Sequence, residues 1–239
     1  MKVPDNLLNF KKFRKLSQAQ SYGDALGANG KQFDVKYWSE IYGSGEDVDG
    51  TFNAKEHALY LKSILKLFDI PVRSLADFGF GKGFLLQRMI QAFQPGRVFA
   101  LDTSKEMVER LKNSKWIHTT NIAVNCGTIQ SINTEIMKYA PYDLGIFNSV
   151  LQYIKNEDIE IVLEKISKIT KYLYFSVPTK NDYTRMKKEI YFEDPYAFAR
   201  TKNFYMKKIS KFFTIVSYNL LESKVNISDS NFNDEIFRF

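Results

Sequence analysis

Three glycines at alternate positions, Gly79, Gly81 and Gly83, constrain the fold of this chain more than any other stretch. Val72 and Leu75 precede them and predict a buried strand. After the glycines, apolar residues recur with the period of a helix: Leu85, Leu86, Met89, Ile90 and Phe93. Glycine permits positive φ angles and leaves no Cβ between the main chain and a ligand, and a helix N-terminus attracts polar or negative groups. The segment therefore predicts a strand, a glycine turn and a helix that together bind a nucleotide-like ligand.

An acid precedes the glycines, so that the run from Asp77 to Gly83 has the pattern D-x-G-x-G-x-G. A dinucleotide site would instead have the spacing G-x-G-x-x-G. The run resembles motif I of the class I methyltransferases that depend on S-adenosylmethionine. This resemblance implies that Asp77, Gly79 and Gly81 lie beside the methionine portion of that cofactor. A tight turn without a ligand is the alternative interpretation.

A second acid follows the next predicted strand. The apolar run Arg97 to Asp102 ends 19 positions beyond Gly83. An acid about 20 positions after a glycine loop can accept hydrogen bonds from ribose hydroxyls. Thr103 opens the sequence T-x-x-E, which fits a capping box, so the next helix does not need Asp102 as its cap. We expect Asp102 and Thr103 to contact the cofactor.

Residues 121–126 predict a third strand, which ends at Cys126. Members of the family commonly carry an acid just after this strand, where it contacts the adenine amine, but here Gly127, Thr128 and Ile129 follow. The resemblance then implies that backbone groups of Thr128 and Ile129 lie beside the adenine. Cys126 itself is expected to be a small buried residue, because it lacks the Pro-Cys pair that cytosine-C5 methyltransferases use as a nucleophile.

Residues 140–154 are similar to motif IV of the same family, with an acid-led apolar strand, polar residues and then an apolar helix that contains an aromatic residue. The resemblance implies that Asn148, Ser149 and Val150 lie beside the methionine half of the cofactor and that Tyr153 lies near the acceptor. The alternative is an ordinary central strand and helix start.

The order of these segments predicts an α/β fold. We expect a Rossmann-like sheet of seven strands, mostly parallel, with an antiparallel last strand and helices on both faces. Predicted helices cover 53–68, 84–94 and 158–169, a fifth strand covers 172–177, and the last two strands cover 212–218 and 232–239. Residues 53–239 would form the cofactor-binding domain, and residues 1–52 a helical and aromatic N-terminal extension that includes an amphipathic helix over 5–20.

Two aromatic segments, 33–52 and 182–206, lie outside the alternating pattern of strands and helices. They are expected to cover the carboxyl edge of the sheet, with Tyr42 against the cofactor and Tyr183 near the acceptor. Alternatively, their aromatic residues complete the hydrophobic core. No general base can be assigned among Tyr153, Tyr183 and His57, and His57 fits a packed helix residue better than a base.

The composition of the chain limits the classes of partner that it is expected to bind. The net charge of +7 could favour nucleic acid, but the basic residues are scattered in pairs. Residues 148–151 also lack the prolines of the Asn/Asp-Pro-Pro-aromatic motif of enzymes that methylate adenine in DNA. One cysteine forms no internal disulfide and favours a reducing cytoplasm. Two distant histidines and one cysteine predict no metal site, and no apolar run is long enough for membrane insertion.

Two classes of function therefore remain open. The first is a methyltransferase that uses S-adenosylmethionine and acts on a small molecule or, less in keeping with the sequence, on nucleic acid or protein. The second is a Rossmann-like protein that binds a nucleotide or regulates without turnover, which the missing acid after the third strand supports.

Overall fold

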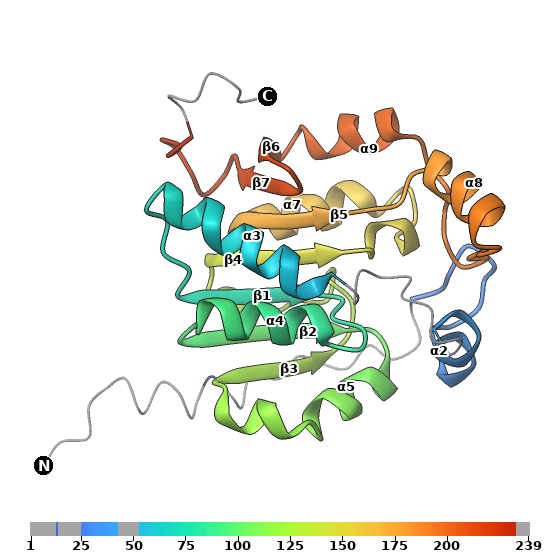
Figure 1. The fold of residues 1–239 in the computed structure, drawn as a ribbon, viewed down its shortest axis with the longest axis horizontal. Helices are drawn as coiled ribbons and strands as arrows, with labels where there is room; N and C mark the ends of the chain where they lie inside the picture. Colours follow the sequence, from blue (N-terminus) through green and yellow to red (C-terminus); the bar gives the residue numbers. More distant parts are fainter. Residues whose placement is uncertain (1–12, 14–24, 43–52, 233–239) are drawn as a thin grey trace, which may run out of the picture.

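The computed structural model describes residues 13, 25–42 and 53–232 (Figure 1). In these ranges a seven-stranded sheet has the order β3-β2-β1-β4-β5-β7-β6. The strands are β1 Ser74–Phe78, β2 Arg97–Asp102, β3 Ile122–Cys126, β4 Tyr142–Asn148, β5 Thr170–Ser176, β6 Phe213–Ser217 and β7 Leu220–Ser223. The helices are α2 Val35–Tyr42, α3 Ala54–Leu67, α4 Phe84–Phe93, α5 Lys105–Lys112, η1 Lys115–Thr119, α6 Thr134–Met137, η2 Leu151–Tyr153, α7 Ile159–Ile169, α8 Lys180–Glu189 and α9 Lys202–Ile209.

Strands β1 to β5 pair in parallel, and β7 pairs antiparallel with both β5 and β6. This arrangement confirms the predicted fold class. The antiparallel partner of β6 is β7, which was not predicted, and the predicted strand over 232–239 falls on residues that the structure describes only at Phe232. The chain reverses directly after β6 at Asn219, whose φ of 52° suits an asparagine in a tight turn. Residues 233–239 lie outside the described part of the chain.

Helices cover both faces of the sheet, because consecutive strand residues point to opposite sides. On one face, α3, α4 and α5 pack on Leu75, Val98 and Leu144. On the other, α7 and α9 pack on Phe78 and Phe147. Figure 1 shows α3 and α4 in front of the strands and α7 behind them. The strand order reverses between β1 and β4, and in open α/β sheets ligands bind at such a switch point.

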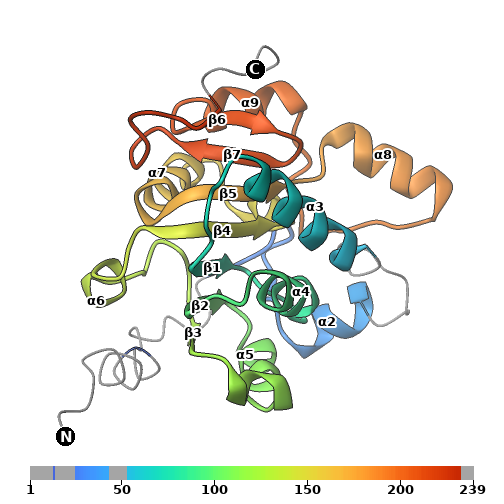
Figure 2. The ribbon, with the colours of Figure 1, turned by 60° about the vertical axis from the view of Figure 1, so that its left-hand side comes forward.

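Two helices lie near the carboxyl ends of the strands without forming part of these layers. Helix α2 lies just beyond the strand ends (Figure 1), and α8, which has no buried residue, projects from the sheet (Figure 2). The predicted helix over 5–20 lies outside the described residues except for Phe13. That side chain is buried against the edge of the Tyr139 ring, with 5.0 Å between the ring centroids. Tyr42 is the last residue of α2, and its side chain is outside the described part.

Tight packing between β4 and β5 makes Gly145 a sensitive position. A Cβ at Gly145 would lie 2.6 Å from Thr170 Cγ2 and 2.8 Å from Leu173 Cδ1. Because inserting a methyl group into a close-packed core forces neighbouring groups to move, Gly145→Ala should lower the free energy of unfolding by about 1–3 kcal/mol. Urea denaturation measures this change.

Gly96→Ala is the matched control, because a Cβ there would meet only Arg73 O at an ordinary 3.7 Å. Equal stability changes in the Gly145 and Gly96 variants would show that packing against β5 does not restrict position 145.

Candidate functional site

A cleft opens at the carboxyl ends of β1, β2 and β4, at the switch point of the sheet. It brings together residues that are far apart in the sequence, from the glycine turn, the end of β2, the segment after β3 and the segment after β4. Of the predicted site residues, those that line it are Asp77, Gly79, Gly81, Asp102, Thr103, Ile129, Asn148, Ser149, Val150 and Tyr153. The sequence patterns thus identified the residues of one continuous cleft.

The glycine turn has the backbone geometry that only glycine adopts easily. Gly79, Gly81 and Gly83 have φ angles of 110°, 51° and 79°. The N–H of Gly79 donates to Leu101 O at 2.7 Å, which joins the turn to β2. A Cβ on Gly79 would lie 2.4 Å from Cγ2 of Val150. The absence of side chains here lets the segments after β1 and β4 approach each other at the floor of the cleft.

Asp102 ends β2 and holds two backbone segments together. Its Oδ2 accepts a hydrogen bond from the N–H of Gly81 at 2.8 Å, and its Oδ1 accepts one from the N–H of Ser104 at 2.8 Å. The side chain is only 7% exposed. Burial raises the pKa of Asp102 to about 6, against the lowering effect of these backbone hydrogen bonds. Asp102 therefore has a structural role at the glycine turn that the sequence did not reveal.

Asp77 is the less compensated of the two carboxyl groups in the cleft. It is 2% exposed, and no described residue donates a hydrogen bond to its carboxylate. Burial and the nearby charge of Asp102 raise the pKa of Asp77 well above its ordinary value. A buried carboxylate without donors is costly in an empty cleft, so this end of the cleft is suited to a ligand that brings positive charge or hydrogen-bond donors.

Ser149 marks the point where the backbone leaves β4. Its φ of 54° is in the left-handed region, which is uncommon for a residue other than glycine. Two hydrogen bonds hold it there: its N–H donates to Ser176 O at 2.9 Å, and its carbonyl accepts from Nε2 of the buried Gln152 at 2.8 Å. Backbone strain that is held in place in this way clusters at functional sites.

The aromatic segment before the domain forms one wall of the cleft. Trp38 on α2 donates from Nε1 to Ser104 Oγ at 3.0 Å, and Tyr37 donates from its hydroxyl to the Tyr153 hydroxyl at 3.0 Å. Helix α2 is therefore attached to both sides of the cleft. Ser104, not Thr103, caps α5, because its Oγ accepts from the N–H of Met107. The prediction of Thr103 as the cap was wrong by one residue, and Thr103 instead lines the cleft.

A second groove continues from the cleft toward β5, α8 and α9. It has a volume of about 620 Å³, within the range of small-molecule sites. Leu85, Asn148 and Ser149 line both spaces. The rest of its lining mixes aromatic and aliphatic side chains with polar and charged ones, among them Tyr174, Phe175, Tyr205, Met186, Met206, Ile209, His57, Thr179, Asp182, Arg185 and Lys202.

Two predicted residues, Thr128 and Tyr183, lie elsewhere than expected. Thr128 does not line the cleft, although its neighbours Gly127 and Ile129 do. Tyr183 lines neither the cleft nor the groove. His57 lines the groove, and its Nδ1 lies 2.9 Å from the Tyr174 hydroxyl, while burial lowers the pKa of the imidazole. This partner agrees with the expectation of a packed histidine.

Several residues of the site could not be assigned from the sequence. Phe33, Tyr37 and Trp38 line the cleft, although only the neighbouring Tyr42 was singled out. Asp194 is the largest omission, because its Oδ2 accepts a hydrogen bond from the Tyr153 hydroxyl at 2.7 Å. It lies in a loop without hydrophobic periodicity, where only the abundance of aromatic residues pointed to a functional role.

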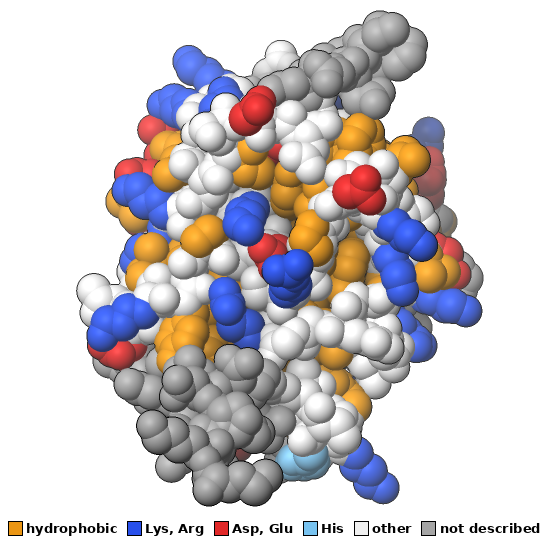
Figure 3. Space-filling view, turned by 90° about the vertical axis from the view of Figure 1, so that its left-hand side faces the viewer, with side chains coloured by type: hydrophobic (Ala, Val, Ile, Leu, Met, Phe, Trp, Pro, Cys, Tyr) orange, Lys and Arg blue, Asp and Glu red, His pale blue; other side chains and the backbone are white. Residues whose placement is uncertain are grey.

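The face of the molecule shown in Figure 3 has no single dominant charged patch. Lys and Arg side chains are dispersed on the face shown in Figure 3, with acidic and apolar groups between them. Within the described ranges, no group of three or more His, Cys, Asp or Glu residues has the arrangement of a metal site. None of the described helices is long and apolar enough to cross a lipid bilayer.

The sheet order, the glycine turn and the acidic cleft define a Rossmann-like domain of the methyltransferase type. Residues 75–172, which carry every strand and turn of the cleft, match a family model described as a methyltransferase domain. Together, the family match and the fold identify residues 75–172 as a methyltransferase domain with a Rossmann-like fold. A comparison with curated protein sequences found no match.

Solved structures share the fold at low sequence identity. The plantazolicin methyltransferase BpumL in complex with SAH has a TM-score of 0.62 at 12% identity, over 87% of this chain and 78% of that one. A methyltransferase from Clostridium acetobutylicum, described as dependent on S-adenosylmethionine, has a TM-score of 0.58 at 12% identity over 79% and 96%. Magnesium protoporphyrin IX methyltransferase from Synechocystis, with bound SAH, has a TM-score of 0.53 at 18% identity over 80% and 95%.

Proposed function

We propose that this methyltransferase binds S-adenosylmethionine in the cleft and transfers the methyl group to a small molecule held in the adjoining groove. The observation that carries the proposal is the pair of buried carboxyl groups, Asp77 and Asp102, in a cleft that is continuous with a second groove. The cofactor brings a sulfonium cation, an ammonium group and ribose hydroxyls. These groups match an acidic cleft whose carboxylates lack full compensation.

The placement of the cofactor follows from the chemistry of the lining residues. Asp102 would accept hydrogen bonds from the ribose hydroxyls, and Ile129 would pack on the adenine. Asp77 and the glycine turn would face the methionine portion, together with Asn148 to Val150. Thr103 would complete the ribose side. Thr128 does not line the cleft, so this placement assigns the adenine side to its neighbours Gly127 and Ile129.

The acceptor site follows from the shared boundary of the two spaces. Asn148 and the strained Ser149 line both, so a molecule in the groove can reach the methyl group of a cofactor in the cleft. The cofactor supplies an electrophilic methyl carbon and a neutral thioether leaving group, and the protein must align the acceptor with it and exclude water. The aromatic lining suits a small molecule with apolar surface. In two of the similar structures, the named enzymes act on plantazolicin or on magnesium protoporphyrin IX.

The N-terminal extension would act as a cover for the cofactor. Its described part, residues 25–42, is attached through Trp38 and Tyr37 to the two sides of the cleft. We take residues 1–52 as this extension and residues 53–239 as the catalytic domain. Binding of the cofactor should slow amide hydrogen exchange in α2. If the exchange rate in α2 does not change when cofactor is added, α2 is a fixed wall of the cleft and not a cover.

Two measurements test the proposed function. Calorimetric titration should show binding of S-adenosylmethionine and S-adenosylhomocysteine but not of NAD or ATP. Transfer of labelled methyl groups into fractionated cell extract should then place the label in the small-molecule pool. Strong binding of NAD alone would reject the methyltransferase reaction and favour the nucleotide-binding alternative. Label in the protein or nucleic-acid pool would reassign the acceptor.

Cofactor affinity should depend on pH through Asp102. Its pKa is about 6 in the free protein, and the ionised form is the better acceptor for ribose hydroxyls. As the pH falls from about 7 to about 5, the Kd for S-adenosylmethionine should therefore increase, by at most about tenfold per pH unit for one released proton. Calorimetry across this range measures the effect.

The raised pKa of Asp102 has the opposite effect on the stability of the free protein, which decreases as the pH rises. A raised carboxyl pKa favours the protonated folded state, so stability is lost as the pH rises through about 6. Asp102→Asn should flatten both pH dependences. If both persist in that variant, another group is responsible.

A further inference from the structure

A carboxylate lies one hydrogen bond away from the cleft. The Tyr153 hydroxyl, which lines the cleft, donates to Asp194 Oδ2 at 2.7 Å. The N–H of Tyr196 donates to the other oxygen, Asp194 Oδ1, at 2.9 Å, which fixes the carboxylate. Burial raises the pKa of Asp194, so it is a stronger base than an exposed aspartate. Nothing in the binding of the cofactor described above uses this pair.

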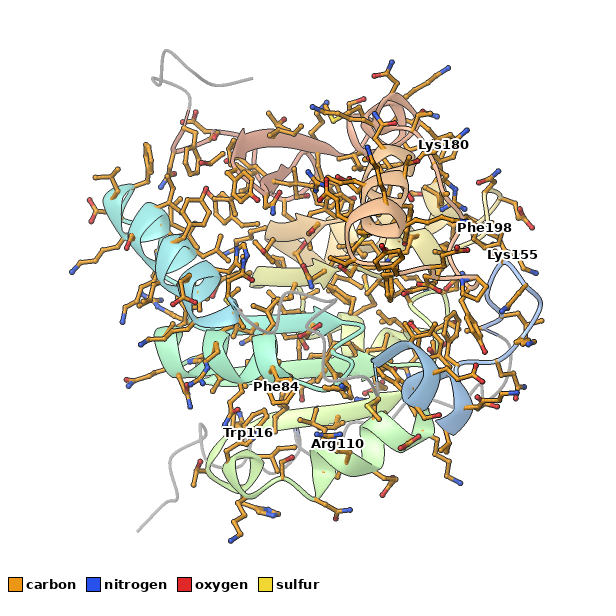
Figure 4. All side chains as sticks on the ribbon, turned by 45° about the vertical axis from the view of Figure 1, so that its right-hand side comes forward. Phe84, Arg110, Trp116, Lys155, Lys180 and Phe198 are labelled. Carbon is orange, nitrogen blue, oxygen red and sulfur yellow. The ribbon has the colours of Figure 1, made fainter. Side chains whose placement is uncertain are left out.

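The loop that supplies Asp194 also holds the turn that carries Tyr153. The buried Arg200 donates from Nη1 to Leu151 O at 3.1 Å and from Nη2 to Ile154 O at 2.5 Å. The N–H of Phe198 donates to Gln152 O at 2.8 Å. Figure 4 shows Phe198 close to Lys155, at the end of the same turn. The loop that carries Asp194 therefore holds the Tyr153 hydroxyl and the Asp194 carboxylate in place relative to each other.

The alternatives for a base are less well placed. The partner of His57, Tyr174, lies two residues before the end of β5 and packs on the side of the sheet covered by α3. His57 lines the groove but not the cleft, where the methyl group of the cofactor would lie. Tyr183 lines neither space. Tyr153 lines the cleft, four residues after Ser149, and an acceptor held in the groove must extend into the cleft to meet the methyl group.

Resting on the proposed function, we infer that Tyr153 and Asp194 form a proton relay that deprotonates a hydroxyl group of the acceptor, so that the enzyme methylates oxygen in phenols or related hydroxylated small molecules. Tyr153 is the catalytic residue, because in this relay its hydroxyl takes the proton from the acceptor oxygen. Asp194 acts through it as the final proton acceptor.

The step balances without a further reactant. The acceptor O–H bond breaks, and its proton moves to the Tyr153 oxygen as the Tyr153 proton moves to Asp194 Oδ2. The acceptor oxygen forms a bond to the methyl carbon, and the electron pair of the breaking S–C bond stays on sulfur. Asp194 then releases the proton to solvent.

A proton relay is useful only to an acceptor that must lose a proton before it attacks the methyl group. A carboxylate or a thioether has no proton to lose before it attacks, and a neutral amine attacks through a free lone pair. A hydroxyl group is a weak nucleophile until it is deprotonated, so it gains most from a general base.

A panel of simple probes tests the acceptor class. Enzyme with labelled S-adenosylmethionine is incubated with 4-methylphenol, pentafluorophenol, aniline, thiophenol or benzoate. The inference expects the phenols to be labelled. An enzyme that binds S-adenosylmethionine but labels neither phenol overturns the inference and leaves the proposed function in place. Failure to bind the cofactor would instead reject the proposed function.

Two isosteric variants test the relay. Tyr153→Phe and Asp194→Asn should each lower kcat for 4-methylphenol by about 100-fold, with changes of less than about threefold in KM and in the Kd of the cofactor. Pentafluorophenol is already ionised at neutral pH, so its kcat should change by less than about threefold in both variants. A merely structural role would lower both rates alike.

Ser74→Ala is the matched control, because it removes a hydroxyl that also donates to an aspartate and joins two strands, through Asp143 Oδ2 at 3.0 Å, and neither residue lines the cleft or the groove. Both kcat values should stay near those of the original enzyme in this variant. Equal losses for the two phenols in the Tyr153 and Asp194 variants, or no loss for either, would overturn the relay.

Discussion

Asp102→Ala should weaken the binding of S-adenosylmethionine by about 1–3 kcal/mol, or roughly 5- to 150-fold in Kd. The variant loses the acceptor for the ribose hydroxyls, and it also leaves the N–H groups of Gly81 and Ser104 without their carboxylate partner. The glycine turn would then be less well ordered for the cofactor. Titration calorimetry with S-adenosylmethionine and S-adenosylhomocysteine measures both affinities.

S-adenosylhomocysteine separates two explanations of this loss, because it has the same ribose but lacks the sulfonium charge. A contact at the ribose predicts similar losses for both ligands, whereas a general effect of charge predicts a larger loss for S-adenosylmethionine. Glu164→Ala, which removes an exposed acid paired with Lys168 on α7, is the control. Unchanged affinity in Asp102→Ala would remove Asp102 from the site.

Gly79→Ala should cost about 2–5 kcal/mol of unfolding free energy and sharply reduce cofactor binding. Two effects add: the φ of 110° strains any residue with a Cβ, and the new methyl group would lie 2.4 Å from Val150 Cγ2. Thermal unfolding and calorimetry measure the two losses.

A double variant separates the two causes. Val150→Ala removes the clashing methyl groups, so Gly79→Ala combined with Val150→Ala should regain the steric part, about 1–3 kcal/mol, and keep the backbone strain. No recovery in the double variant would show that the contact with Val150 is not the cause of the loss.

The parts of the fold that depend on local patterns were predictable from the sequence. Strands β1, β2 and β4, and helices α3, α4 and α7, follow from apolar periodicity and from the glycines that end it. The residues that line the cleft on these strands, such as Asp77, Asp102 and Asn148, follow because the carboxyl ends of parallel strands meet at one edge. Their roles toward the cofactor remain proposals.

The remaining features depend on contacts between distant segments. Nothing near Asp194 in the sequence indicates that it meets Tyr153, and the hydrogen bonds of Arg200 to the same turn are equally remote. The position of β7 was missed because a four-residue strand has too few residues to show alternation. Thr103 and Ser104 are both residue types that favour the N-cap position, and only the backbone direction after β2 decides between them.

The division of the site between two stretches of chain affects how such an enzyme can change. Apart from residues of α3 and Leu85, the groove is lined by strand ends from Asn148 onward and by segments after β5. The cleft, in contrast, is lined only by residues up to Ile154 in the sequence. A lineage could therefore alter residues 174–221 and gain new acceptors while its cofactor affinity stayed constant. A mutant library confined to this range should yield altered specificity far more often than lost cofactor binding.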